Sequence, residues 1–410
     1  MSPLGSASGI LGLQVITTST IVGFTRPSSV YRSAGLPISA LLVYTQLSHI
    51  DSLKHPIGRS FLGAASVFLA ILYIDVALLS RWSFEAQGPT SSLGGLTPID
   101  NQPIKSNGQC SQVKKSPRQL RDLVDRLFFG LQVTLQSRFP ATNWPVKNIP
   151  PFYQRDPHYV PSKVAFLIRN SLKCIIYIDL LRLTSRLGNP EDNPILFSQD
   201  HVPFFQRLGD ISSTELQTRV LGVLGYWTIQ YMVISVLYST LAILAVVLGL
   251  SAVSEWPPVF GSVVDSWSLG QFWGCFYHQL VRRGCSSIGH FVFHHCLGLK
   301  RGGFLTRYIF ITLVFTVSGI FHLLSDIPQQ IPMSESGAMQ FFCMQGLGIM
   351  FEDAIHTLFQ KLIGESKNKV LIATKRLGGY IWVVAWLAWT SPIWIYPAMR
   401  RDTGTPLVPF

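Results

Sequence analysis

Long apolar runs separated by short polar segments recur along the whole chain. A helix needs about 20 predominantly apolar residues to cross the hydrocarbon core of a bilayer. Runs that approach or exceed this length predict membrane-spanning helices at residues 9–24, 36–50, 60–79, 216–252, 304–324, 340–363 and 380–399. The run at 216–252 could hold one tilted span or a broken pair, and a further run at 164–181 is either a short span or a re-entrant helix. The pattern predicts an all-α fold, a polytopic membrane helical bundle of about seven to nine spans.

Two polar stretches interrupt this series. Residues 83–115 are rich in Gly, Ser, Pro, Asn and Gln without an apolar face, which predicts an exposed loop. Leucines then recur at helical spacing over 118–139, which is typical of an amphipathic helix at the membrane interface. We therefore expect N-terminal membrane spans at 1–82, a polar loop with an interfacial helix and linker at 83–163, and the main membrane bundle at 164–410.

The charge content agrees with lipid as the solvent. Only 13% of the residues are charged, against roughly 25% in an average soluble domain. The formal net charge is +12, and the basic residues lie between apolar runs, which indicates cytoplasmic loops and anionic headgroups rather than nucleic acid. These basic residues include Lys114, Lys115, Arg118, Arg121, Lys367, Lys369, Lys375 and Arg376. We expect a lipid bilayer and no nucleic acid among the partners.

Two histidines differ from their apolar surroundings. His322 lies inside the run at 304–324, where an ionisable side chain is costly unless it faces the bundle interior and has a partner. It either takes part in chemistry or only hydrogen-bonds a neighbouring helix. Asp326, four residues later, is a candidate to orient its imidazole. His278 follows Trp273 and precedes Arg282, and aromatic side chains in this setting indicate either an interfacial belt or a site.

A metal site is a competing interpretation. His290, His294 and His295 have the spacing of a histidine box that could bind iron in a membrane desaturase or hydroxylase. A di-iron site needs several such boxes, whereas the chain has 10 histidines and no second cluster. We expect no metal, and expect these three side chains to flank an interfacial helix or to contact a polar ligand.

Acidic residues within or near the apolar runs suggest a second alternative, an ion path through a channel or transporter. They are Asp75, Asp179, Asp326, Glu352 and Asp353. They are not spaced as a relay, and most lie near predicted span ends, where a solvated carboxylate is unremarkable. The chain also shows no internal repeat of the kind on which many transporters are built. A transporter of a small hydrophobic metabolite stays as the alternative from another functional class.

Four short motifs follow one another between residues 138 and 322. They are Trp144-Pro-Val-Lys-Asn-Ile-Pro150, Trp256-Pro-Pro-Val-Phe-Gly261, Phe272-Trp273 through His278-Gln279, and Ser318-Gly-Ile-Phe-His322. Together they resemble the fungal wax synthase-like branch of the membrane-bound O-acyltransferase superfamily. The resemblance implies that acyl groups pass from acyl-CoA to an alcohol within a helical bundle in the endoplasmic reticulum membrane, with residues 164–410 as the catalytic part.

The resemblance also implies site residues. His322 matches the presumed catalytic base, and His278 matches a second polar position that is asparagine in many relatives. A neutral imidazole can accept the alcohol proton, and a second one can donate a hydrogen bond to the developing oxyanion. Trp273 and Gln279 are candidates to hold a substrate, and Asp326 and Ser318 to support His322. Five basic residues are candidates for the CoA phosphates, with positive-inside topology as the alternative: Arg282, Arg283, Lys300, Arg301 and Arg307.

The preferred function is an acetyltransferase of the terpenoid or meroterpenoid pathways of filamentous fungi, as the resemblance implies. The expected co-substrate is acetyl-CoA, the expected acceptor is a hydroxyl on a hydrophobic polycycle, and no permanently bound cofactor is expected. Within the same enzyme class, the alternative is a long-chain wax ester synthase. A catalytically dead scaffold is a third possibility, which predicts that both histidines can be replaced without consequence.

Overall fold

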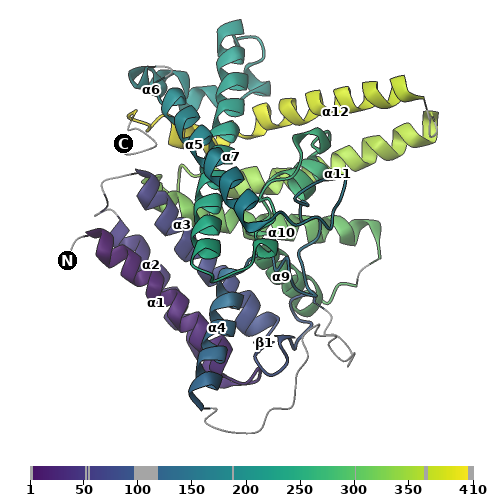
Figure 1. Ribbon diagram of the computed structural model, residues 1–410. Helices are drawn as coiled ribbons and strands as arrows, with labels where there is room; N and C mark the ends of the chain where they lie inside the picture. Colours follow the sequence, from purple (N-terminus) through teal and green to yellow (C-terminus); the bar gives the residue numbers. More distant parts are fainter. Residues whose placement is uncertain are drawn as a thin grey trace. The chain divides into compact units, whose positions relative to one another are not determined.

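The computed structural model describes residues 3–50, 53, 56–96, 119–186, 189–300, 302–363 and 368–404 (Figure 1). The longer helices are α1 (Pro3–Phe24), α2 (Val30–His49), α3 (Pro56–Tyr73), α4 (Gln119–Leu135), α5 (Lys163–Thr184), α7 (Ser213–Val247), α9 (Arg282–Phe291), α10 (Phe304–Asp326), α11 (Ala338–Ile363), α12 (Lys369–Thr390) and α13 (Pro392–Met399). The short helices are α6 (Asn193–Leu196) and α8 (Leu269–Gln271). Three π-helical turns continue helices: η2 (Ile74–Leu79), η8 (Phe272–Phe276) and η9 (Val292–Cys296).

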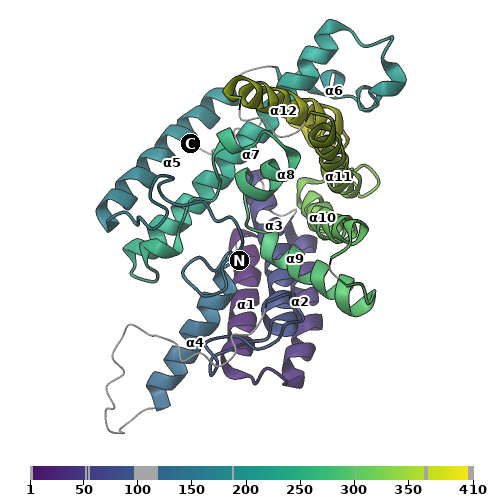
Figure 2. The same ribbon diagram turned by 90° about the vertical axis from the view of Figure 1, so that its right-hand side faces the viewer.

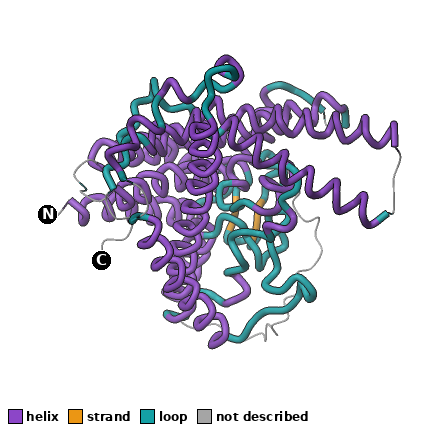
Figure 3. The backbone as a smooth tube through the Cα atoms, turned by 90° about the horizontal axis from the view of Figure 1, so that it is seen from above, coloured by secondary structure: helices purple, strands orange, loops and turns teal. Residues whose placement is uncertain are grey.

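The regular secondary structure of the described part is almost entirely helical, which confirms the predicted all-α class. The strands in it are β1 (Trp82–Ser83) and β2 (Gly88–Pro89), a two-residue antiparallel ladder drawn in orange among purple helices in Figure 3. The 3₁₀ turns are Pro190–Asp192, Gln199–His201, Phe205–Arg207, Val253–Glu255, Val263–Asp265 and Ile327–Gln329. The β ladder lies within the predicted loop at 83–115, of which residues 97–115 fall outside the described ranges.

Among the described residues, five helices are long and apolar enough to cross a membrane. They are Ala7–Phe24 of α1, Pro56–Leu79 of α3 with η2, α7, Phe304–Gln329 of α10 with its following turn, and α12. A polytopic helical membrane fold is therefore confirmed, although five is fewer than the seven to nine spans predicted. The helices α2, α5 and α11 are long, but charged residues such as Arg32, Lys173 and Glu352 reduce their apolar character.

The helices decide one open alternative and correct one predicted span. The run at 216–252 is a single span rather than a broken pair, because α7 continues through 35 residues without interruption. The run at 380–399 is divided at Ser391, where α12 ends and Pro392 begins α13. Proline is favoured at the start of a helix and disfavoured in its interior, since it lacks the N–H for the helical hydrogen bond. The span is therefore α12, which begins at Lys369. Of the basic residues named above, Lys114, Lys115, Arg118, Arg301 and Lys367 lie outside the described part.

The chain forms two compact units, each assembled from separate segments. The first unit contains Met1–Leu53, Phe61–Ser137 and Arg283–Thr306. The second contains Lys54–Ser60, Arg138–Arg282 and Arg307–Phe410. These units cut across the three-part division at residues 82 and 163 that composition suggested, so that division remains a prediction from sequence alone.

In the first unit, α1 packs against both α2 and α4. A Cβ atom on Gly130 of α4 would lie 2.0 Å from the Ser19 carbonyl oxygen, and one on Gly23 of α1 would lie 2.3 Å from the Arg126 carbonyl oxygen. The Ser19 hydroxyl also donates to the Thr134 hydroxyl across the same contact, at 3.2 Å. Small residues and interhelical hydrogen bonds of this kind are typical of helix packing within membranes.

In the second unit, an aromatic core surrounds α8 and η8. α7 packs against both α5 and α12, and Figure 2 shows α5 and α7 side by side. Trp227 of α7 contacts Trp273, Tyr277 and Phe341, with ring centroids between 5.1 and 5.9 Å apart, and its indole N–H donates to Ser391 at 3.0 Å. Aromatic side chains bury large areas and contribute strongly to core stability. This core contains the two histidines that the sequence singled out.

Candidate active site

His322 lies on α10 against three aromatic rings. Its imidazole stacks on Phe342, with ring centroids 4.3 Å apart and an interplanar angle of 6°. Trp394 and Phe321 lie on two further sides, at 4.9 and 4.8 Å. We call these three rings the aromatic cage. Among the described residues, neither nitrogen of the His322 ring has a hydrogen-bonding partner, so a nitrogen of the ring can accept a substrate proton.

Glycines allow α10 and α11 to approach closely enough to form the aromatic cage. A Cβ atom on Gly319 would lie 3.1 Å from Met339 Sδ and 3.2 Å from Met339 Cα, and one on Gly346 would lie 3.1 Å from the Thr312 hydroxyl. Small residues let neighbouring backbones approach in this way. The glycine of the motif Ser318-Gly-Ile-Phe-His322 therefore has a packing role, because it lets α11 approach α10 close to His322.

His278 lies just after η8, where the backbone becomes extended. The Tyr277 amide donates to the Phe272 carbonyl at 2.7 Å, and Tyr277 then adopts φ −70° and ψ 155°. π-helical turns are frequent at functional sites. The His278 ring lies against Tyr277 and Phe260, at 4.8 and 6.0 Å between centroids. Its Nδ1 atom is buried and has no hydrogen-bonding partner among the described residues, which is uncommon for a buried polar atom.

Both imidazoles belong to the second unit, where Trp273 contacts Phe342 beside His322 and Tyr277 beside His278. Burial, with a smaller effect from the positive charge of Arg138, lowers the pKa of His278 to about 4. His278 is therefore neutral at cytosolic pH. A neutral imidazole has one N–H donor and one acceptor nitrogen, so His278 can donate a hydrogen bond without introducing a charge.

Two contacts hold η8 in place. The Glu352 carboxylate of α11 accepts from the amides of Leu269 and Gly270, at 3.0 and 3.2 Å, and so caps the first turn of α8. At the other end, the Gly261 amide donates to the Phe276 carbonyl at 2.8 Å. A Cβ atom on Gly261 would lie 2.2 Å from the Cys275 carbonyl oxygen, so only glycine fits there. The last residue of the motif Trp256-Pro-Pro-Val-Phe-Gly261 thus permits this close backbone contact.

Trp273 contacts residues that lie beside each of the two histidines. Its ring is 6.0 Å from Phe342, which stacks on His322, and 5.5 Å from Tyr277, which precedes His278. Its indole N–H donates to Gln345 Oε1 at 3.2 Å, and the same oxygen accepts from the Trp386 indole at 3.1 Å. Gln345 is fully buried. The sequence analysis did not identify it, and the only available signal was an amide within an apolar helix.

Asp326 contacts the aromatic cage rather than His322. Its carboxylate accepts from the Trp394 indole at 3.2 and 3.3 Å and from the Ser336 hydroxyl at 2.5 Å. The structure gives no hydrogen bond from this carboxylate to the imidazole, so any orientation of the ring acts through Trp394. Ser318 is buried one turn before His322 on α10.

The polar residues after His278 join two of the motifs. The Gln279 amide donates to the carbonyls of Asn148 and Gly274, at 2.7 and 3.3 Å, while its Oε1 is buried without a partner in the described part. Arg282 donates to the carbonyls of Lys147 and Gly274, at 3.2 and 2.7 Å. Both side chains therefore hold the loop containing the motif Trp144–Pro150 against η8. Gln279 has one free polar atom for a substrate, whereas the Arg282 contacts are with the backbone.

Two of the other residues predicted to bind CoA phosphates, Arg283 and Arg307, form ion pairs with acidic side chains. Arg283 belongs to the first unit, where it donates to both oxygens of Asp75 at 2.7 and 3.0 Å, and both side chains are buried. Its guanidinium is thus paired with Asp75, and phosphate binding by Arg283 stays a prediction from sequence. Arg307 pairs with Asp353 at 2.8 Å, and Arg301 lies outside the described part.

The acidic residues considered for an ion path each have a structural partner. Asp75 is fully buried and pairs with Arg283, which corrects the expectation of a solvated carboxylate at that position. Asp179 pairs with Arg182 at 3.1 Å, and Glu352 caps α8. These partners give the carboxylates a structural role in the fold.

The histidines at 290, 294 and 295 lie in the first unit. The rings of His290 and His294 are 4.4 Å apart, and the Nδ1 atoms lie 3.2 and 2.7 Å from the carbonyls of Leu93 and Leu299. Within the described ranges, no group of three or more His, Cys, Asp or Glu side chains is arranged to hold a metal ion.

A cavity of about 300 Å³ opens beside the aromatic cage. Ser336, which lines it, donates to Asp326, and Ile393, which also lines it, precedes Trp394. Gln340 adds an amide to the lining two residues before Phe342. The volume is within the usual range of small-molecule sites.

Sequence comparison gives a consistent group of similar proteins. Residues 256–344, which include both histidines, match the profile of the "Membrane bound O-acyl transferase family". The chain is 47% identical to acetyltransferase fsoF of Humicola fuscoatra, over 98% of both chains. It is 34% identical to acetyltransferase aurG of Calcarisporium arbuscula, over 98% of this chain and 93% of the other. No solved structure is significantly similar.

Proposed function

Since the chain belongs to the membrane-bound O-acyltransferase family, and is an acyltransferase, we propose that it acetylates a hydroxyl group of a hydrophobic terpenoid or meroterpenoid, with acetyl-CoA as the donor. The acetyl group is supported by the names of the similar proteins, and a hydrophobic acceptor by the membrane fold. We place the reaction in the endoplasmic reticulum membrane, as part of fungal secondary metabolism.

In this proposal, His322 is the general base. A nitrogen of its ring takes the proton of the alcohol as the alcohol oxygen attacks the thioester carbonyl carbon. A tetrahedral intermediate forms, the carbon–sulfur bond breaks, and the imidazolium returns the proton to the CoA thiolate. The products are the acetate ester and CoA. No acyl-enzyme is needed, because the alcohol attacks the thioester directly.

His278 is proposed to stabilise the oxyanion of this intermediate. It is neutral, its Nδ1 has no described protein partner, and it lies in the same aromatic core as His322. A hydrogen bond that forms with the developing charge lowers the barrier more than it strengthens substrate binding. The observation that best supports the mechanism is this pair of imidazoles, which two motifs 44 residues apart bring together in one aromatic core.

The acceptor alcohol is proposed to occupy the 300 Å³ cavity beside the aromatic cage. Its lining combines apolar groups, such as Val202 and Ile393, with the polar side chains of Ser336, Gln340, Glu335 and Arg400, of which the last two form an ion pair. The apolar groups suit a hydrophobic skeleton, and the polar side chains suit the oxygen functions of the acceptor. Ile393 of the lining is followed in the chain by Trp394, whose ring contacts the His322 ring at 4.9 Å, and this contact supports a cavity close to the proposed base.

The proposal is tested by acetyl transfer in microsomes that contain equal amounts of the wild type, His322→Ala, His278→Ala and the control His356→Ala. His356 is an exposed histidine on α11. With labelled acetyl-CoA and a panel of terpenoid alcohols, we expect ester from the wild type and the control. We expect ester formation to fall by about 10³-fold or more without His322, and about 10²-fold without His278.

Other outcomes discriminate between alternatives. Ester formation that survives in His322→Ala would refute the base assignment. Ester from long-chain acyl-CoA and not from acetyl-CoA would identify a wax ester synthase. Movement of a terpenoid across the membrane without consumption of acyl-CoA would contradict the enzymatic function.

A further inference from the structure

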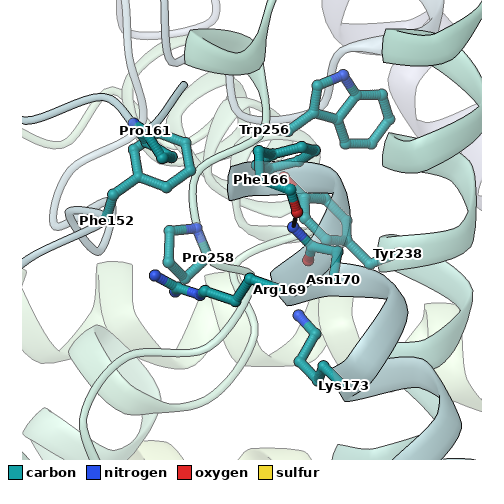
Figure 4. A pocket seen from close by; sticks show the side chains of 9 residues that line it. All are labelled: Phe152, Pro161, Phe166, Arg169, Asn170, Lys173, Tyr238, Trp256 and Pro258. Atoms are coloured by element: carbon teal, nitrogen blue, oxygen red, sulfur yellow. Dashed lines mark hydrogen bonds between the residues drawn. The ribbon is translucent and has the colours of Figure 1, made fainter. Parts of the chain in front are cut away.

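A second, smaller pocket lies between α5, α7 and the loop that contains Trp256 (Figure 4). Its volume is about 30 Å³, which is room for about two water molecules. One face of α5 supplies four of the lining residues, at positions 166, 169, 170 and 173. This i, i+3, i+4, i+7 spacing places them in one stripe along the helix. The pocket therefore has room for a small chemical group, and the side chains that line it indicate the charge of that group.

Two cations line this pocket without a compensating acid. Arg169 and Lys173 are separated by about one turn of α5, and none of the nine described lining residues is acidic. No described carboxylate is within ion-pair distance of either side chain. Burial lowers the pKa of Lys173, and the positive charge of Arg169 lowers it further. Lys173 is half-buried and Arg169 is exposed, and an anion bound between these two like charges would reduce the repulsion between them.

Aromatic side chains form the rest of the wall. Phe152 and Phe166 meet edge to face with centroids 6.3 Å apart, and Tyr238 and Trp256 lie 5.2 Å apart. Figure 4 shows both cations on one side of the pocket and Phe152, Phe166 and Trp256 on the other. Apolar walls reduce the local dielectric constant, which strengthens the attraction between a bound anion and the cations.

The pocket is connected to His278 through one short segment. Arg138 is buried and donates to the carbonyls of Pro257 and Pro258, both at 2.7 Å, and to the Tyr238 hydroxyl. Pro258 lines the pocket, and two residues further along the chain Phe260 lies 6.0 Å from the His278 ring. One loop, which the hydrogen bonds of Arg138 hold, thus contacts both the pocket, through Pro258, and the proposed oxyanion donor, through Phe260.

We infer that the pocket at Arg169 and Lys173 binds a phosphate group of the acyl donor and so anchors CoA for transfer. This inference rests on the proposed function, which supplies a donor with several phosphates. The pocket is too small for a whole nucleotide, but it has room for phosphate oxygens. Lys and Arg are the usual phosphate ligands in proteins. The pantetheine arm then leads from this loop toward His278. A phospholipid headgroup presents the same chemistry and is the competing source of the phosphate.

The experiment compares acetyl-CoA with acetyl-pantetheine, which contains the same thioester but none of the phosphates of CoA. The full-length protein is reconstituted in neutral phosphatidylcholine vesicles, as the wild type, the double variant Arg169→Gln with Lys173→Met, and the control Arg186→Gln. Arg186 is exposed just after α5, 13 residues from Lys173, or roughly 20 Å along the helix axis.

We expect the double variant to raise KM for acetyl-CoA about 10-fold or more, with kcat for both donors and KM for acetyl-pantetheine unchanged within about 2-fold. The control should match the wild type. Unchanged turnover of acetyl-pantetheine shows that the variant is folded. An equal rise of KM for both donors, or no rise for either, would overturn the inference.

A second arm adds phosphatidylserine to the vesicles. If the double variant changes only the response of activity to this anionic lipid, the pocket binds a headgroup and the inference is wrong. If the wild type makes no ester with either donor in any vesicle, it is the proposed function that fails. The two failures are therefore distinguishable.

Discussion

The replacement of Asp326 separates two roles that a carboxylate near a catalytic histidine could have. If its charge acts on His322, Asp326→Asn should be as damaging as Asp326→Ala. If it acts by holding Trp394 against the His322 ring, as the hydrogen bonds indicate, asparagine should largely suffice, because its amide oxygen can still accept from the indole. Alanine cannot, and it leaves the indole N–H of a buried tryptophan without an acceptor.

The expected magnitude follows from these contacts. A buried donor without a partner costs about 1–3 kcal/mol, which Trp394 can avoid by moving away from Asp326 and His322. If that cost appears in the transition state, Asp326→Ala should lower kcat about 10- to 100-fold. Asp326→Asn should stay within about 3-fold of the wild type, because it replaces a charge-assisted hydrogen bond with a neutral one.

The assay is acetyl transfer under saturating acetyl-CoA, with an acceptor that the alcohol panel has identified and with protein amounts matched. Trp394→Phe serves as the matched variant, since it keeps a ring beside His322 but has no N–H. In the Asp326→Ala background, Trp394→Phe should cause little further loss, because the interaction is already absent. Equal loss of activity in Asp326→Asn and Asp326→Ala would refute the positioning role.

Three further predictions concern the second unit. Gly261→Ala should reduce the yield of folded protein and the acetyl transfer rate at least 10-fold, because its Cβ would lie 2.2 Å from the Cys275 carbonyl oxygen. The control Gly274→Ala should be tolerated, because its Cβ would have no neighbouring atom within 4 Å. Because the pKa of His278 is about 4 when folded and about 6.5 when unfolded, the unfolded state binds the proton first as pH falls. The free energy of unfolding should thus be highest above pH 6.5 and should decrease by up to about 3 kcal/mol as the pH falls to 4, as measured by thermal unfolding in detergent. Gln340→Leu should raise KM for the alcohol about 5- to 10-fold and leave KM for acetyl-CoA unchanged, in steady-state assays in which each substrate is varied in turn.

Controls keep these predictions specific. For the pH dependence, His278→Gln should unfold with less acid sensitivity than the wild type, and identical profiles would contradict the assignment. For the cavity, a change of KM for acetyl-CoA alone in Gln340→Leu would place the donor, not the alcohol, in the cavity.

The spans were predictable where apolar periodicity alone decides the structure. α1, α3, α7 and α10 lie close to their predicted ranges, because about 20 apolar residues in succession have few alternatives to a spanning helix. The predicted span at 380–399 was wrong because hydropathy does not show where a helix ends, although Pro392 was a visible signal of the break. The grouping of residues 283–306 with the N-terminal helices depends on contacts between residues about 200 positions apart, which periodicity does not encode.

The site was predictable to a similar degree. His322, His278 and Trp273 lie in one aromatic core, as their motifs suggested, although their roles remain proposals. Arg282 and Arg283 were treated alike because they are adjacent, but consecutive helical residues point in different directions. One donates to backbone carbonyls of the second unit, and the other pairs with Asp75 in the first. Arg138 and Gln345 were missed because single polar residues in apolar segments have no motif of their own.

The pair of Asp75 and Arg283 has a consequence for how the chain enters the membrane. Asp75 belongs to an early span, but its partner is 208 residues later in the sequence. At typical rates of translation, the ribosome needs about 10–40 s to reach Arg283 after Asp75. During that time the carboxylate has only the neighbouring Ser80 hydroxyl, 2.6 Å away in the finished fold, as a local partner. Chains that end before Arg283 should therefore insert this span poorly and be degraded, and the order of synthesis makes completion of the polar pair a late step of assembly.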